Sequence, residues 1–91
     1  MAKKVLSHEE KQAKYDAEMA KIQIKHDKRL EYLAKKRARL TEKINKKFAD
    51  DPEKLEQEMG IMHIDNDVWI DIAHAQLAER AKTLELKYLK D

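Results

Sequence analysis

The sequence predicts an all-α protein that folds as an elongated helical hairpin. The chain of 91 residues contains one Gly and one Pro, so it offers few places at which a helix would end. Apolar residues recur at helical spacing over long stretches, and helix-capping sequences precede these stretches. We expect three helices, over residues 8–49, 52–59 and 68–89, within a single domain that covers residues 1–91.

The first and longest helix is expected to begin after Ser7. The Ser7 hydroxyl can accept a hydrogen bond from the Glu10 amide while the Glu10 carboxylate reaches back, which is a capping box. From there to Ala49 most residues are good helix formers. The helix would have about 42 residues and a length of roughly 63 Å at ~1.5 Å per residue. Residues 1–6 precede the cap and are expected to form a flexible tail.

An eleven-residue repeat runs through this long helix. Eleven residues in three turns is about 3.67 residues per turn. This period predicts that the seam, the line along which the helix contacts a partner helix, is nearly straight or slightly right-handed. Two sets of residues fall in phase at this spacing: Lys14, Lys25, Lys36 and Lys47, and Ile22, Leu33 and Ile44. The same period defines a mostly apolar stripe that we expect to be buried: Tyr15, Met19, Ile22, His26, Leu30, Leu33, Arg37, Leu40, Ile44 and Phe48.

Two polar residues interrupt this stripe. His26 is expected to be an interface histidine with its hydrogen bonds satisfied. Arg37 is expected either to extend its charged end to solvent past the apolar stripe or to pair with a carboxylate of the third helix, Glu79 or Glu85. Small side chains flank the stripe on one side and favour docking of the third helix there: Ala34, Ala38, Thr41, Asn45 and Ala49.

The segment after the long helix contains two further helix starts. Asp51 is the predicted N-cap of a short helix, and Pro52 suits its first helical position. Gly60 is expected to end this short helix in the left-handed conformation. Residues 61–66 would then connect it to the third helix.

The third helix is too short to cover the first. At roughly 33 Å it would reach along only about half of the long helix, so the N-terminal half is expected to overhang with an apolar face exposed. Such a face needs either a second copy, giving a homodimer, or a different protein. The residues assigned to this interface are Tyr15, Met19, Ile22, Ile24 and His26.

Charge is segregated along the chain, although the formal net charge is only +2. Residues 25–47 form a basic helix segment with ten bases and three acids, whereas residues 50–67, the acidic hinge, carry one base and seven acids. The bases of the first segment gather on one side of the helix. This cationic ridge consists of Lys25, Arg29, Tyr32, Lys36, Arg39, Lys43, Lys46 and Lys47.

Both charged segments admit more than one interpretation. The ridge can displace counterions from a DNA or RNA backbone, with Tyr32 stacking on a base, or it can be the ordinary solvated face of a Lys-rich helix. The acids of the hinge can reflect the preference of Asp and Glu for helix starts. They can also pack against the ridge and compete with nucleic acid, or face a basic groove of a partner protein.

Several kinds of chemistry are excluded. Without Cys there is no disulfide, Zn-thiolate site or Cys nucleophile, and one Gly cannot make a glycine-rich phosphate loop. We expect no enzymatic activity, no cofactor and no small-molecule substrate. Asp67, Asp71 and His74 share one helix face and are weak candidates for a metal site. Helix capping and an Asp71–His74 contact explain them without a metal, so no metal is expected.

The absence of a long apolar run or a signal-peptide pattern favours a soluble, cytoplasmic protein that does not bind membranes. The first functional hypothesis is a non-enzymatic accessory protein that acts as a homodimer and binds nucleic-acid backbone through the ridge, without sequence specificity. The second is an inhibitor or adaptor, of the type that phages or mobile elements encode, which lays its long helix into a groove of a host protein complex. The third is a structural component that lengthens by self-association.

Overall fold

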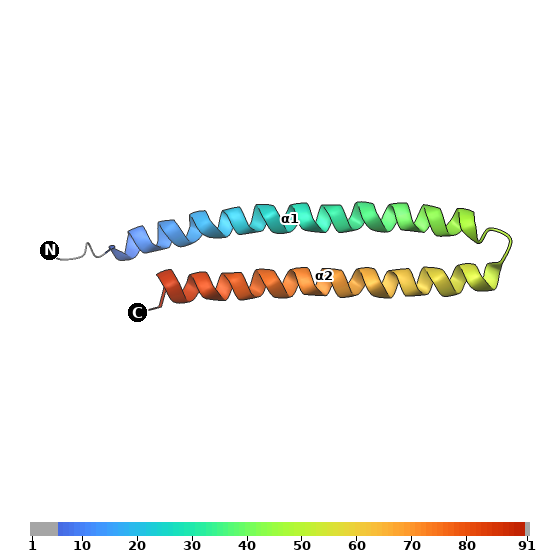
Figure 1. Ribbon diagram of the computed structural model, residues 1–91. Helices are drawn as coiled ribbons and strands as arrows, with labels where there is room; N and C mark the ends of the chain where they lie inside the picture. Colours follow the sequence, from blue (N-terminus) through green and yellow to red (C-terminus); the bar gives the residue numbers. More distant parts are fainter. Residues whose placement is uncertain (1–5, 91) are drawn as a thin grey trace.

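The computed structural model describes residues 6–90 and shows an antiparallel helical hairpin (Figure 1). Helix α1 spans His8–Lys47 and helix α2 spans Pro52–Tyr88, and no strand occurs between residues 6 and 90. The helices run side by side as a rod with principal extents of 74 × 19 × 17 Å. The radius of gyration is 20.8 Å, far above the ~12 Å of a compact domain of this length. The elongated all-α hairpin is therefore confirmed, and the predicted flexible tail lies outside the described residues apart from Leu6.

Both helices start where the sequence predicts. The Ser7 hydroxyl accepts a hydrogen bond from the Glu10 N–H at 3.1 Å. The Asp51 carboxylate likewise accepts from the amide three residues further on, at 3.1 Å, and Pro52 lies in the first turn of α2. The tight turn between the helices is closed by the Asp51 N–H, which donates to the Phe48 carbonyl at 3.0 Å.

The prediction of three helices is wrong, because α2 continues through the expected break. Gly60 lies inside α2 without a positive φ angle, and residues 61–66 are helical instead of forming a connector. A glycine within a helix costs only about 0.5–1 kcal/mol relative to alanine. Breaking the helix there would put the apolar residues before and after Gly60 out of phase against α1, which would cost more.

The predicted N-terminal overhang is also wrong. With 37 residues, α2 is nearly as long as the 40-residue α1, and its C-terminal end (red) lies close to the start of α1 (blue) in Figure 1. Ile22 of α1 accordingly shares a hollow with Leu84 of α2. The overhang depended on a third helix that began near residue 68, whereas α2 begins at residue 52 and covers α1 along most of its length.

The eleven-residue period of α1 recurs in α2, where two sets of residues fall in phase at this spacing: Leu55, Asn66, Leu77 and Tyr88, and Met62, Ala73 and Leu84. Because both seams have about 3.67 residues per turn, the two helices stay in contact without strong supercoiling. The core is thin. Its buried apolar side chains are Leu33, Met62 and Ala73, and no described side chain is fully buried.

Arg37, the cation within the seam, pairs with an imidazole instead of a carboxylate. Its Nε donates to Nδ1 of His63 at 3.1 Å, and its Nη2 lies 2.8 Å from the same nitrogen. The predicted partners Glu79 and Glu85 are wrong, since the antiparallel course places them beside the N-terminal part of α1.

Two further polar contacts cross the seam. Nδ2 of the buried Asn66 donates to the Leu33 carbonyl at 3.3 Å, and its Oδ1 has no hydrogen-bond partner among the described residues. The rings of His26 and His74 lie 5.0 Å apart, centroid to centroid, and His26 is buried as predicted. Three contacts across the seam share one antiparallel register, because the numbers of the two paired residues sum to 99 or 100 in each. The pairs are Arg37–His63, Leu33–Asn66 and His26–His74.

Candidate nucleic-acid interface

The cationic ridge lies along one edge of α1. Every member is exposed except Lys36, which is half-buried beside α2. Lys25, Lys36 and Lys47 are eleven residues apart, so the ridge runs nearly parallel to the helix axis and spans roughly 33 Å at ~1.5 Å per residue. The Tyr32 side chain is 56% exposed and lies open to solvent. The structure thus places the predicted ridge residues together on one accessible edge.

Few of these cations are engaged in ion pairs. Lys46 pairs with Glu42 at 3.1 Å, and the Lys47 ammonium lies 5.3 Å from the centroid of the Phe48 ring. The other ion pairs of the described chain join residues of α1 that lie outside the ridge. Within residues 6–90, five ridge cations have neither a carboxylate oxygen within 4.0 Å nor a cation–π contact: Lys25, Arg29, Lys36, Arg39 and Lys43.

Helix α2 borders the ridge and adds a cation to it. A hollow of about 230 Å³ lies between the helices, lined by Lys25 and Arg29 from α1 and by Gln76 and Arg80 from α2. Sequence reasoning missed Arg80, because a separate third helix gave no register from which to place it. The antiparallel register, which pairs residues whose numbers add up to about 100, is the signal that would have found it.

A second hollow, of about 270 Å³, lies beside Lys36 on the same edge of the hairpin. There α2 contributes Glu58, Asp65 and Trp69. The acidic hinge thus lies alongside the basic helix segment. This is the arrangement expected if the acids of the hinge pack against the ridge. No ion pair joins the two helices within residues 6–90, so the acids do not hold the ridge cations in fixed contacts.

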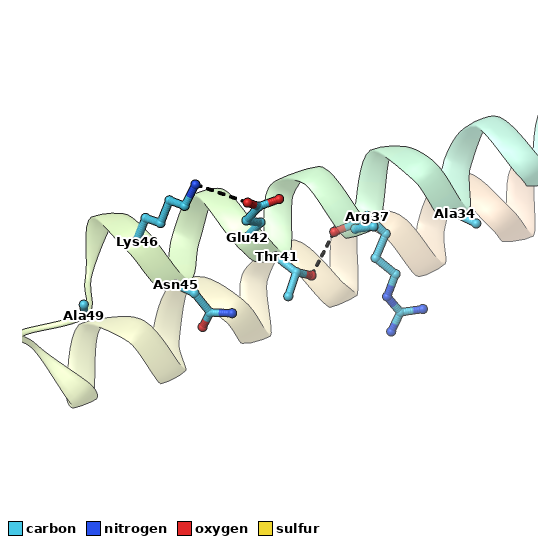
Figure 2. A pocket seen from close by; sticks show the side chains of 8 residues that line it. Ala34, Arg37, Thr41, Glu42, Asn45, Lys46 and Ala49 are labelled. Carbon is cyan, nitrogen blue, oxygen red and sulfur yellow. Dashed lines mark hydrogen bonds and ion pairs between the residues drawn. The ribbon is translucent and has the colours of Figure 1, made fainter.

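The opposite flank of α1 is a shallow hollow (Figure 2) of about 780 Å³, and its lining residues are Ala34, Arg37, Ala38, Thr41, Glu42, Asn45, Lys46 and Ala49. The prediction that a helix docks on this flank is wrong, since Ala34, Ala38 and Ala49 stay exposed. Helix α2 packs instead on the centre of the apolar stripe, where Leu33 is buried. The Thr41 hydroxyl is satisfied locally and donates to the Arg37 carbonyl at 2.8 Å.

The residues predicted to form a dimer or partner interface lie in two environments. Tyr15, Met19 and Ile22 are half-buried and His26 is buried, because α2 covers this side of α1. Only Ile24 is well exposed, at 55%. Helix α2 therefore takes up part of the surface on which Tyr15, Met19, Ile22 and His26 are expected to meet a partner.

The three weak metal candidates do not gather into a site. Asp67, Asp71 and His74 are exposed along α2, and His74 turns its ring toward His26. Among residues 6–90, no group of three or more His, Asp or Glu side chains is placed to hold a metal ion.

No protein family model matches this chain, and no curated protein or solved structure matches it. Within the part of the chain that the structure describes, neither helix has the length and hydropathy needed to cross a bilayer. We infer a function from the cationic ridge and the two hollows beside it.

Proposed function

We propose that this protein is a non-enzymatic accessory protein that binds the phosphate backbone of nucleic acid through the cationic ridge of α1. The supporting observation is the row of five ridge cations without a carboxylate or aromatic partner along one edge of α1. Cations in such a row displace counterions from phosphates, which is the main source of sequence-independent affinity. Arg80 of α2 adds a sixth cation beside the ridge.

The geometry of the ridge favours contact with the backbone over recognition of bases. Lys25, Lys36 and Lys47 recur at intervals of about 16.5 Å along the middle of α1, away from both ends of that helix (His8–Lys47) except at Lys47 itself. Phosphate contacts fix position but carry no sequence information. Tyr32 is the exposed aromatic residue of the ridge, and it supports stacking on an unpaired base.

The number of available cations sets the expected salt dependence. For five phosphate contacts, the slope of log K against log salt is about −4.5 for duplex DNA and about −3.5 for a single strand. Between 50 and 200 mM salt, affinity is then expected to fall about 500-fold for duplex DNA and about 130-fold for a single strand. Fluorescence anisotropy with labelled duplex and single-stranded DNA and RNA measures this directly.

A pair of charge reversals tests whether the ridge is the contact. The double variant Lys36→Glu, Arg39→Glu is expected to weaken binding about 100-fold at 50 mM salt, because two phosphate contacts are lost. The matched control is Lys82→Glu, Lys90→Glu, which makes the same change of net charge at the C-terminal end of α2 and just beyond it, and it should bind nearly as wild type. Circular dichroism must show unchanged helicity in both variants.

Equal loss of binding in the two double variants would mean that only net charge matters and would overturn the assignment to the ridge. Absence of wild-type binding at 50 mM salt would overturn the proposal altogether. The alternative hypothesis, an inhibitor or adaptor that engages a protein complex through the long helix, would then be tested by capture of an acidic partner that Lys36→Glu, Arg39→Glu releases.

A further inference from the structure

A second apolar surface lies on α2 and is not part of the hairpin seam. This outer stripe consists of Ile61, Ile64, Val68, Trp69 and Ile72, whose exposed fractions run from 38% to 65%. At ~100° per residue, its centre lies about 120° around the helix from the seam residues Met62, Asn66 and Ala73. We propose that the outer stripe is a homodimer interface on which α2 of a second copy packs in the antiparallel direction.

The size of the stripe fits this role. Eight large apolar residues are exposed in the described chain, and five of them fall within these twelve residues. Together they expose on the order of 450 Å², in the range of the largest apolar patches of monomers, which are often functional. Two copies facing each other would bury about 900 Å² from these side chains alone, and flanking residues bring the total near the ~1,000 Å² expected of a specific interface.

A second copy also fits because the hairpin alone has little core. Leu33, Met62 and Ala73 are the buried apolar residues of the described chain, and none is fully buried. Two helices bury only one face each, whereas four helices share a core. Pairing through the outer stripe would cover the larger part of the apolar surface that the hairpin leaves open.

The charges of α2 favour the antiparallel direction. Residues 52–71 carry six acids and one base, for a net charge of −5, whereas residues 72–90 carry two acids and four bases, for a net charge of +2. A parallel pair would align the two acidic halves. An antiparallel pair places each acidic half beside the basic half of the other copy, which is electrostatically complementary.

This interface does not depend on nucleic-acid binding, but it has a consequence for it. Ile61 and Trp69 line the same hollow as Lys36, so the outer stripe and the ridge border one edge of the hairpin. In an antiparallel pair the two-fold axis is perpendicular to the plane that contains the two α2 helices. Rotation about this axis leaves the ridge edge of each copy on the same side of that plane. The two ridges would therefore lie on one face of the dimer.

The first test compares two Ile→Asp substitutions. Ile64→Asp lies in the outer stripe, and Ile24→Asp lies at a similarly exposed position of α1, with exposed fractions of 65% and 55%. Sedimentation equilibrium between 1 and 200 µM should show a wild-type dimer of about 21.6 kDa, twice the 10.8 kDa chain mass. Ile64→Asp should weaken dimerisation at least 100-fold, whereas Ile24→Asp should change it less than threefold.

The comparison separates the outer stripe from the interface that the sequence predicts. A wild-type monomer throughout this concentration range would overturn the proposal and leave the stripe for a heterologous partner. Loss of the dimer in Ile24→Asp but not in Ile64→Asp would overturn it in favour of the N-terminal surface. Both positions are exposed, so unchanged helicity is expected in each variant.

The second test determines direction and exploits the absence of Cys from the chain. Val68→Cys lies near the centre of the stripe and should form an intermolecular disulfide under mild oxidation. Leu86→Cys, on the same side of α2, should not, because in an antiparallel pair its two copies lie about 50 Å apart along the axis and a disulfide needs Cα atoms within ~7 Å. Cross-linking at both positions would indicate a parallel pair, and cross-linking at neither would contradict the interface.

Discussion

Asn66 is the residue whose substitution tests the seam most directly. It is 5% exposed, its amide nitrogen donates to the Leu33 carbonyl at 3.3 Å, and its Oδ1 lacks a partner among the described residues. A buried acceptor without a hydrogen bond costs about 1–3 kcal/mol. We therefore expect Asn66→Leu, which has a similar volume and no polar atoms, to stabilise the hairpin.

The magnitude follows from three contributions. Removing the unpartnered oxygen gains about 1–3 kcal/mol, and burying an apolar side chain in its place gains about 1.5–3 kcal/mol. The lost hydrogen bond to Leu33 costs about 0.5–1.5 kcal/mol, and imperfect fit of the branched side chain costs about 1–3 kcal/mol. The middle values of these ranges sum to a gain of about 4 kcal/mol and a cost of about 3 kcal/mol, so the free energy of unfolding of Asn66→Leu is expected to rise by about 1 kcal/mol.

Urea unfolding followed by circular dichroism at 222 nm measures this change. With a slope near ~1 kcal/mol per M, the midpoint should rise by about 1 M. Protein concentration must be the same for all variants, because self-association would add to apparent stability. The control is Asn45→Leu at an exposed position of α1, which should change stability by less than about 0.5 kcal/mol.

Destabilisation of Asn66→Leu by more than about 1 kcal/mol would contradict this prediction, because it would mean that Oδ1 is satisfied or that the polar contact outweighs the apolar gain. A second consequence concerns register. A buried Asn disfavours shifted pairings of two helices. A single cooperative transition in wild type and a broader one in Asn66→Leu is therefore the expected pattern.

Three further predictions address the core, the Arg37 contact and the helical glycine. Leu33→Ala should lower the free energy of unfolding by about 2–5 kcal/mol, seen as a lower thermal midpoint; a midpoint within about 2 °C of wild type would show that Leu33 does not carry the core. In a double-mutant cycle of Arg37→Met and His63→Leu, the coupling energy should be at least about 1 kcal/mol, because the donor is charged; additive effects would contradict the contact. Gly60→Ala should stabilise α2 by about 0.5–1 kcal/mol, since an added Cβ meets no atom within 4 Å, whereas a loss of stability would mean that the glycine is required.

The sequence alone was sufficient for the features that depend on local chemistry. The caps at Ser7 and Asp51 and the long straight helix follow from side chains within a few residues of one another. The one-sided ridge also follows from helical period, because residues eleven apart share an edge whatever packs against the helix. The structure confirms the two caps and the long first helix, and the ridge residues lie together on one edge of that helix.

Tertiary structure decided what depends on distant partners. Gly60 is a residue at which a helix often ends, yet α2 continues through it. The packing of α2 against α1 outweighs the free-energy cost of one glycine within a helix. The partner of Arg37 and the place of Arg80 beside the ridge both require the antiparallel register, which no short-range pattern contains. The outer stripe of α2 could likewise be recognised as unburied only once the seam had taken the other side of the helix.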